Sequence, residues 1–87
     1  MNIYYLKKFR KAAKKEFKIR FVDNKYFIMK YNYHNDEWES IIYSNNDYAT
    51  NNLYIAKLTL AHERRRYILD LVKEMREFKE NKKLAKL

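Results

Sequence analysis

Six lysines near the amino terminus have the spacing of one face of a helix. Apolar residues recur there every three or four positions and predict a helix over residues 3–17, with Asn2 as its N-cap. The opposite side of this helix carries Lys7, Lys8, Lys11, Lys14, Lys15 and Lys18. Lysine is a flexible cation that holds a phosphate backbone without reading bases. Because like charges at this spacing repel one another, the pattern favours a face that binds RNA, DNA or an acidic protein surface over a merely solvated one.

A second candidate surface lies in the C-terminal third of the chain and is rich in arginine. The abundance of lysine in this chain is what an AT-rich coding sequence would produce, but the arginines are less well explained in that way. Its members are Arg64, Arg65, Arg66 and Lys73. Ordinary ion pairing with Glu63, Asp70 and Glu77 is an open alternative for these cations. Lys57 and Arg64 fall on the side of the predicted helix that should pack, so each must reach out to solvent or meet a carboxylate of the strands.

The chain has nine tyrosines, which are many for its length. Tyrosine offers a large contact area at low entropic cost, and it stacks on unpaired bases. Five tyrosines that cannot all belong to the core are candidates for a protein interface: Tyr31, Tyr33, Tyr43, Tyr48 and Tyr54. The alternative is a half-buried sheet whose aromatic residues are enriched by codon usage.

The chain contains no glycine, proline or cysteine. Phosphate-binding loops and dinucleotide fingerprints need glycine at fixed positions, and a thiolate zinc site needs cysteine, so these sites are excluded. The only histidines are His34 and His62, and Arg66 stands where a zincin-type motif needs its second histidine. Carboxylates near His34 are more typical of a solvated turn than of a metal site. We therefore predict no catalytic residue, no metal and no cofactor, with a ribonuclease that uses a histidine and arginines as a rival.

The elements that must position these residues begin with three strands after the first helix. Alternating and aromatic-rich segments predict strands over 17–22, 26–33 and 37–43. Asp23 and Asn24 suit a tight hairpin turn, in which Asn24 takes the left-handed conformation that glycine usually supplies.

The C-terminal half is predicted to be helical. Ser44 and Asp47 have the spacing of a helix cap, and residues 67–78 follow a strictly helical pattern. Residues 53–66 fit either a helix or a fourth strand, and residues 51–52 are candidates for a break. The fold class is therefore α+β: an N-terminal helix, a three-stranded antiparallel meander and a long C-terminal helix, continuous or broken. Residues 1–87 form a single domain, with 81–87 as a frayed tail.

The net charge of +9 and a pI of about 9.7 favour polyanionic partners. Its placement is uneven, because residues 1–20 hold eight cations against Glu16 alone, while residues 21–40 are net acidic. With no cysteine, signal peptide or long apolar run, we expect a location in the cytoplasm of a host cell and no membrane partner. The oligomeric state is left open.

Small size, AT-type composition, absence of a nucleotide-binding motif and charge polarity together resemble, as a class, phage-encoded inhibitors of host machinery, including anti-CRISPR proteins. The resemblance implies stoichiometric binding to a nucleic-acid-processing protein or ribonucleoprotein complex. The element order is also similar to that of double-stranded RNA-binding domains, although residues 50–57 lack the lysine-rich, glycine-preceded helix start of those domains. RelE-like ribonuclease toxins are similar in size and basicity but not in strand order.

The leading hypothesis is a nonenzymatic binding protein that inhibits or modulates such a complex through its protein surface, its RNA or its DNA. A freestanding RNA- or DNA-binding protein is the alternative. A membrane-surface protein and a ribonuclease toxin are less favoured, the former because the apolar face of the first helix is needed for the core.

Overall fold

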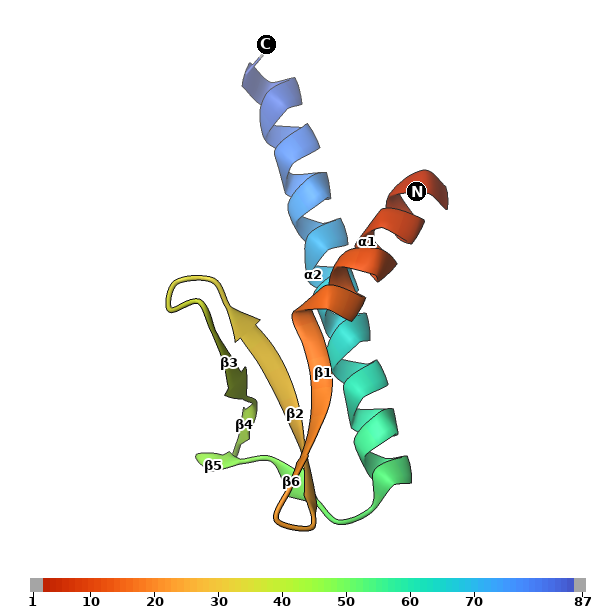
Figure 1. Cartoon of the computed structure of the whole chain (residues 1–87). Coiled ribbons are helices and arrows are strands. Elements are labelled where there is room, and N and C mark those ends of the chain that lie inside the picture. The colour runs from red at the N-terminus through yellow and green to blue at the C-terminus, as the bar shows by residue number, and fades with distance from the viewer. Residues whose placement is uncertain (1–2, 86–87) are drawn as a thin grey trace.

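The computed structural model describes residues 3–85 and shows an α+β fold (Figure 1). The predicted N-cap, Asn2, lies outside the described residues. In chain order the elements are α1 (Ile3–Glu16), β1 (Phe17–Val22), β2 (Lys25–Asn32), β3 (Glu37–Ser40), β4 (Ile42–Tyr43), β5 (Asn46–Asp47), β6 (Ala49–Thr50) and α2 (Leu53–Ala85). The predicted helix, antiparallel strands and long C-terminal helix are confirmed. The single domain and the frayed tail from Asn81 stay predictions; α2 continues past Asn81 to Ala85.

Helix α1 passes into strand β1 without a loop, because Glu16 ends the helix and Phe17 begins the strand. The helix forms where the apolar spacing predicts it, with Ala13 and Glu16 buried and the lysines exposed. Its end one residue before the predicted one moves Lys18 off the helix and onto β1. The expected ladder of lysines on α1 therefore ends at Lys15.

Strands β1 and β2 form a hairpin with a two-residue turn, in the register Val22↔Lys25. Asp23 and Asn24 have φ values of 53° and 60°, so both take the left-handed conformation that this turn requires. Aspartate and asparagine tolerate this conformation better than other side chains do. The predicted turn, with Asn24 in place of a glycine, is confirmed.

The third strand of the meander is interrupted, which corrects the predicted strand over 37–43. Strands β3 and β6 pair with successive parts of the same edge of β2, and the small hairpin β4–β5 projects between them. The backbone N–H of Ile41 donates to Ile28 O (2.9 Å), and that of Tyr48 donates to Ile41 O (2.9 Å), closing the hairpin at its base. Ser44 and Asn45, with φ values of 52° and 67°, form its turn.

Helix α2 begins at Leu53 and not near Ser44, so the cap predicted at Ser44 and Asp47 is wrong. The Asn52 Oδ1 accepts hydrogen bonds from the backbone N–H of Tyr54 (2.9 Å) and of Ile55 (3.3 Å), which makes Asn52 the N-cap. From there α2 is one helix of 33 residues. The candidate fourth strand over 53–66 is thus excluded, and the asparagines at 51–52 mark a beginning and not a break.

Replacing Asn52 with alanine is expected to lower the free energy of unfolding by about 1 kcal/mol, because two backbone donors at the start of α2 lose their acceptor. Urea denaturation followed by circular dichroism measures the change. The matched control is Asn51→Ala, one residue outside the cap, for which we expect a change of less than about 0.5 kcal/mol. Equal losses in both variants would contradict the assigned cap.

The core lies between α2 and one face of the sheet. Phe17, Ile28 and Ala56 form its buried centre, and the Tyr67 ring meets the Phe17 ring edge-on at 5.9 Å. The register places Phe17, Ile19 and Ile28 on this same face of the sheet. Helix α1 packs against α2, so neither described helix covers the other face of the sheet (Figure 1).

Candidate nucleic-acid interface

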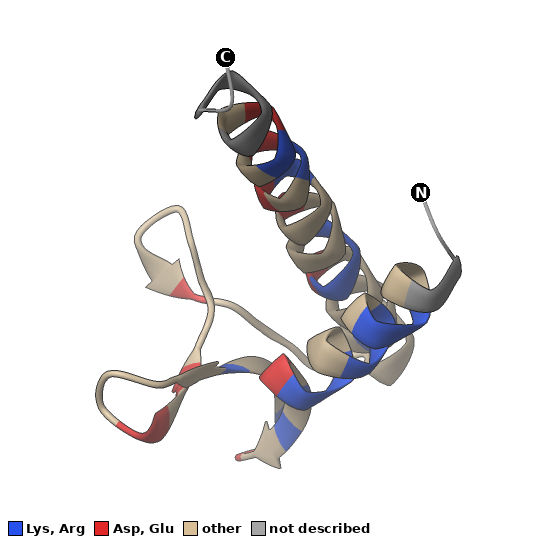
Figure 2. Ribbon diagram, turned by 90° about the horizontal axis from the view of Figure 1, so that it is seen from above, with Lys and Arg blue, Asp and Glu red and all other residues tan. Residues whose placement is uncertain are grey.

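The cations of α1 are exposed as the sequence predicts. Lys7, Lys8, Lys11, Lys14 and Lys15 all lie at the surface, and Arg10 joins them although sequence reasoning did not single it out. Figure 2 shows Lys and Arg along the length of α1 and on the strand that follows it. Glu16, the one acid of this helix, is only 7% exposed, so it leaves the positive surface largely uncompensated.

Lys18 lies on the uncovered face of the sheet and not on α1. Side chains alternate between the two faces of a strand, so Lys18 and Arg20 point away from the core side that holds Phe17. The Lys18 amine lies 4.0 Å from the centre of the Trp38 ring, in a cation–π contact. The predicted cation is therefore surface-exposed, but its neighbour is an aromatic ring.

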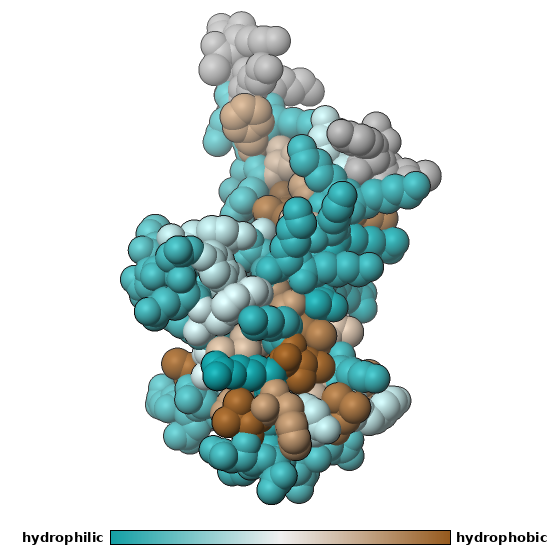
Figure 3. Space-filling view, viewed as in Figure 1, coloured by the Kyte–Doolittle hydropathy of each residue, from teal (hydrophilic) through white to brown (hydrophobic). Residues whose placement is uncertain are grey.

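Aromatic residues gather on this uncovered face because β2 and β3 are in register. Tyr31 pairs with Trp38, and their rings meet edge-on at 5.3 Å. The Tyr33 ring contacts Tyr31 at 4.8 Å. Figure 3 shows pale and brown side chains over the sheet, with hydrophilic side chains between them and above them on α1. We call Lys18, Arg20, Tyr31 and Trp38 the open sheet face.

Sequence reasoning missed Trp38 and Arg20 as site residues. The alternation of β1 is visible in the sequence and separates Lys18 and Arg20 from the apolar positions. What the sequence does not show is that Trp38 pairs across β2 onto the same face, because this depends on the register of three strands.

Arg64 is only partly exposed, unlike the other cations predicted on α2. Its Nη2 donates to the backbone carbonyl of Phe17 (2.9 Å), at the junction of α1 and β1. The Arg64 Nε is buried without a hydrogen-bond partner among the described residues, and burial lowers the pKa of the guanidinium. The sequence predicts that Arg64 and Lys57 each reach out to solvent or meet a carboxylate. Arg64 does neither, because its partner is a backbone carbonyl, whereas Lys57 is exposed.

The other predicted cations of α2 are exposed, and of these only Arg65 lines a hollow together with cations of α1. Arg66 lies 3.7 Å from Glu63 in an ion pair one turn apart, as the alternative interpretation expects. Arg65 lies where α2 packs against α1, and Lys73 lies farther along α2. An exposed ion pair of this kind contributes little to stability.

The five predicted interface tyrosines separate into three environments. Tyr31 and Tyr33 lie at the open sheet face and its edge. Tyr43 donates a hydrogen bond to Glu63, and Tyr48 packs against the core with its hydroxyl 2.8 Å from Thr59 Oγ1. Tyr54, 70% exposed, stands at the start of α2. The structure therefore brings only the first pair next to the cations.

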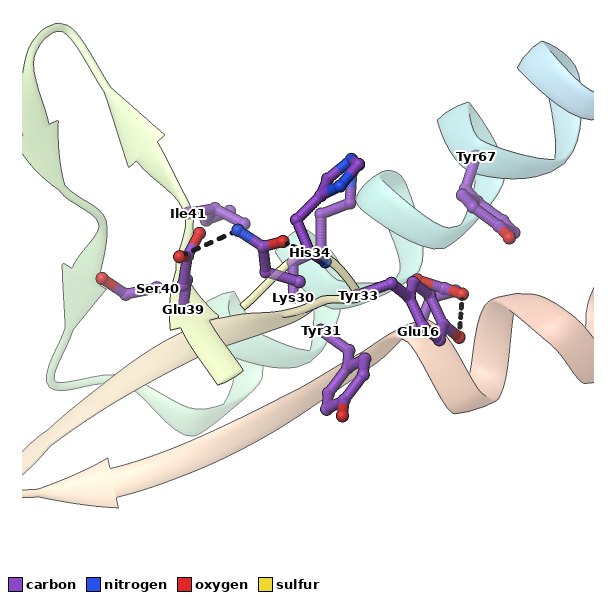
Figure 4. A pocket seen from close by; sticks show the side chains of 10 residues that line it. Glu16, Lys30, Tyr31, Tyr33, His34, Glu39, Ser40, Ile41 and Tyr67 are labelled. Atoms are coloured by element: carbon purple, nitrogen blue, oxygen red, sulfur yellow. Dashed lines mark hydrogen bonds between the residues drawn. The ribbon is translucent and has the colours of Figure 1, made fainter. Parts of the chain in front are cut away.

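A hollow of about 460 Å³ opens beside the end of α1, and Figure 4 shows the side chains that line it. The Tyr33 hydroxyl donates to the buried Glu16 carboxylate (2.5 Å), and this bond raises the pKa of Tyr33. Burial and then Glu16 raise the pKa of Tyr67. His34 lines the hollow, but no arginine does so among the described residues, and His62 lies elsewhere on α2. The histidine and arginines of the rival ribonuclease are not assembled there.

No group of three His, Asp or Glu side chains within residues 3–85 lies close enough together to hold a metal ion. Within the same range, no helix is both long and apolar enough to cross a membrane.

The hydrogen bond from Tyr43 to Glu63 gives stability a pH dependence. Burial, followed by Glu63, raises the pKa of Tyr43 to about 12, above the value of about 10 in an unfolded chain. The bond therefore stabilises the fold below pH 10, and its contribution is lost as the pH rises from about 10 to 12. Spectrophotometric titration of tyrosinate is expected to lose its highest transition in Tyr43→Phe. In Glu63→Gln the same transition moves to lower pH; an unchanged transition in both variants would contradict the assignment.

No protein-family model matches this chain, and neither the curated proteins nor the solved structures contain a significant match to it.

Proposed function

We propose that this protein is a nonenzymatic nucleic-acid-binding protein that holds a single-stranded segment of RNA or DNA. The cations of α1, with Lys18 and Arg20, hold phosphates, and Trp38 and Tyr31 stack on bases. The observation that carries the proposal is the Lys18 amine 4.0 Å above the Trp38 ring, on a sheet face that neither described helix covers.

Both components of the surface match what unpaired nucleic acid offers. A single strand presents phosphates and exposed base faces together, and stacking on an aromatic residue contributes about 1–3 kcal/mol per base. A base that stacks on Trp38 takes the position of the Lys18 amine, which is then free to pair with a neighbouring phosphate. In a duplex the base faces are stacked on one another, so Trp38 and Tyr31 would contribute little to its binding.

The lysines continue the path of the strand beyond the bases. Lys7, Lys11 and Lys15 follow one another over about 12 Å of helix at 1.5 Å per residue. Lysine holds a backbone as a point charge and does not select a sequence, and stacking tolerates every base. We therefore expect binding with little sequence preference and a strong dependence on salt.

The anti-CRISPR-type inhibitor suggested by the sequence stays a prediction, and so does the cytoplasm of a host cell. Such an inhibitor would use this surface by occupying the exposed guide or displaced strand of a nucleic-acid-handling complex. Nucleic-acid binding is the part of that hypothesis that the geometry supports.

The single tryptophan of the chain makes the proposal directly testable, because Trp38 is at the proposed site. Titration with oligothymidylate or oligouridylate of about 16 nucleotides is expected to quench the Trp38 emission to saturation at low salt. A duplex of the same length should bind more weakly and quench little. If the duplex bound as tightly as the single strand and quenched the Trp38 emission as strongly, the single-strand assignment would be overturned. If neither the single strand nor the duplex bound or quenched the emission, the proposed function would be overturned.

The stacking role has its own variants. Trp38→Ala is expected to weaken binding of a fluorescently labelled oligonucleotide about 5- to 100-fold, measured by anisotropy, whereas Trp38→Phe keeps a ring and most of the affinity. Tyr54→Ala removes an exposed aromatic residue at the start of α2, away from the open sheet face, and is the control, with no change expected. A loss in Tyr54→Ala as large as in Trp38→Ala would place the contact elsewhere.

A further inference from the structure

A second hollow, of about 510 Å³, lies between α1 and α2. Its lining residues are apolar or cationic, with no acidic side chain among those described. The apolar residues are Leu6, Ala13, Ala61, Ile68 and Leu69; the cations are Arg10, Lys14, Arg64 and Arg65. We call these nine residues the interhelical groove. It is a different surface from the open sheet face, and none of its residues lines the hollow at Glu16.

Arg64, one of the residues that line this groove, has a buried donor without a partner among the described residues. The Arg64 guanidinium gives its Nη2 to the Phe17 carbonyl, while its buried Nε has no partner among the described residues. A buried guanidinium nitrogen without an acceptor is costly, and a carboxylate is the acceptor that best fits the planar fork of arginine. Arg10 and Arg65 add charge on both sides of the same groove.

Exposed apolar residues continue along one face of α2 from Leu69, which lines the hollow, toward the start of that helix. Leu69 is 57% exposed, Leu58 54% and Ile55 46%. Their spacing of eleven and three residues keeps them on one helix face with Ala61 and Arg65. From Ile55 to Leu69 this face is about 21 Å long at 1.5 Å per residue, the length of a helix of about four turns.

We propose that the interhelical groove, with Ile55 and Leu58, binds an acidic amphipathic helix of a partner protein. The apolar face of such a helix covers Leu58 and Leu69, and its carboxylates meet Arg10, Arg64 and Arg65. Helix-in-groove recognition with apolar anchors one turn apart uses this arrangement. The proposal goes beyond nucleic-acid binding and does not depend on it.

The charges favour this occupant over two others. A second copy of the chain would bring another +9 charge to a groove lined by cations, which opposes self-association. A nucleic-acid backbone would satisfy the cations but leave Leu69 and Leu58, which are exposed apolar residues, without a partner. A helix that combines leucine and glutamate satisfies both.

The test uses a synthetic helical peptide of about 15 residues, with leucine on one face and glutamate on the other. We expect it to bind the intact protein and to shift the Arg64 Nε–H signal in proton–nitrogen NMR spectra. Arg10→Glu with Arg65→Glu is expected to weaken binding at least 10-fold in fluorescence anisotropy. The matched control, Lys7→Glu with Lys11→Glu, makes the same change in net charge outside the groove and should weaken binding less than 3-fold.

Four outcomes would overturn the proposal. The peptide fails to bind; the two double variants lose affinity equally; a lysine–leucine peptide of the same pattern binds as tightly; or the Arg64 Nε–H signal does not move. If sedimentation shows a dimer whose formation the peptide does not disturb, the groove belongs to a second copy of the chain. If oligothymidylate displaces the peptide and shifts the same NMR signals, the groove belongs to nucleic acid. Loss of oligonucleotide binding in Trp38→Ala with peptide binding intact separates this groove from the nucleic-acid surface.

Discussion

Replacing Lys7, Lys11 and Lys15 with glutamate is expected to weaken oligonucleotide binding about 100-fold or more at low salt, while the protein stays folded. All three side chains are exposed on α1, and none lines the interhelical groove, unlike Lys14. Each reversal removes a phosphate contact and adds a repulsive charge. Because all three positions are exposed on the helix surface, the substitutions should change the free energy of unfolding little.

Fluorescence anisotropy over a range of salt concentrations measures this effect. Each phosphate contact to a single strand contributes about −0.7 to the slope of log affinity against log salt, so the triple variant should have a slope about 2 units shallower. The matched control reverses Lys73, Arg76 and Lys79 on the C-terminal half of α2, which extends away from the sheet (Figure 1). We expect a loss of less than about 10-fold there, which would argue against the predicted binding role of Lys73. Equal losses in the two triple variants would mean that α1 is not a distinct binding site.

Ile28→Ala is expected to lower the free energy of unfolding by about 2–5 kcal/mol, the largest effect of any single substitution considered for this fold. Ile28 is fully buried and lies with Phe17 and Ala56 at the centre of the core, between the sheet and α2. A domain of this size has a modest core, so this loss is a large part of its total stability.

Urea or thermal denaturation measures the loss, with two controls. Ile28→Val removes one methylene at the same position and should cost about 0.5–1.5 kcal/mol. Ile42→Ala makes the same truncation at a residue that is 63% exposed on the small hairpin, and should change stability by less than about 0.5 kcal/mol. If Ile42→Ala destabilised the protein as much as Ile28→Ala, the core would not be centred where the structure places it.

The elements with a strong local signal could be predicted from the sequence. The three- and four-residue apolar spacing of α1 and the Asp23–Asn24 turn are local properties, and both are confirmed. Ser44 to Asp47 misled because the same polar residues suit a helix cap and a hairpin turn. The choice between them depends on the pairing of β6 with β2, a contact between residues more than 20 positions apart.

For the candidate site too, only the local features could be predicted from the sequence. Exposure of the lysines on α1 follows from their positions on a helical wheel, and the structure bears it out. The environments of Lys18, Trp38 and Arg64 depend on strand register and on how α2 crosses the end of α1, which no local pattern encodes. A cation at a packing position, as at Arg64, signals a specific partner but does not show that the partner is a backbone carbonyl.

The direct passage from Glu16 to Phe17 has a consequence for recognition. With no hinge between the helix and the strand, and with Arg64 tied to the carbonyl at that junction, the lysines and the aromatic rings keep a fixed mutual orientation before any ligand arrives. The entropy of arranging them is then lost once, when the chain folds, and not again at each encounter. A flexible insertion at this junction would leave every contact residue in place yet slow the formation of the complex and shorten its lifetime.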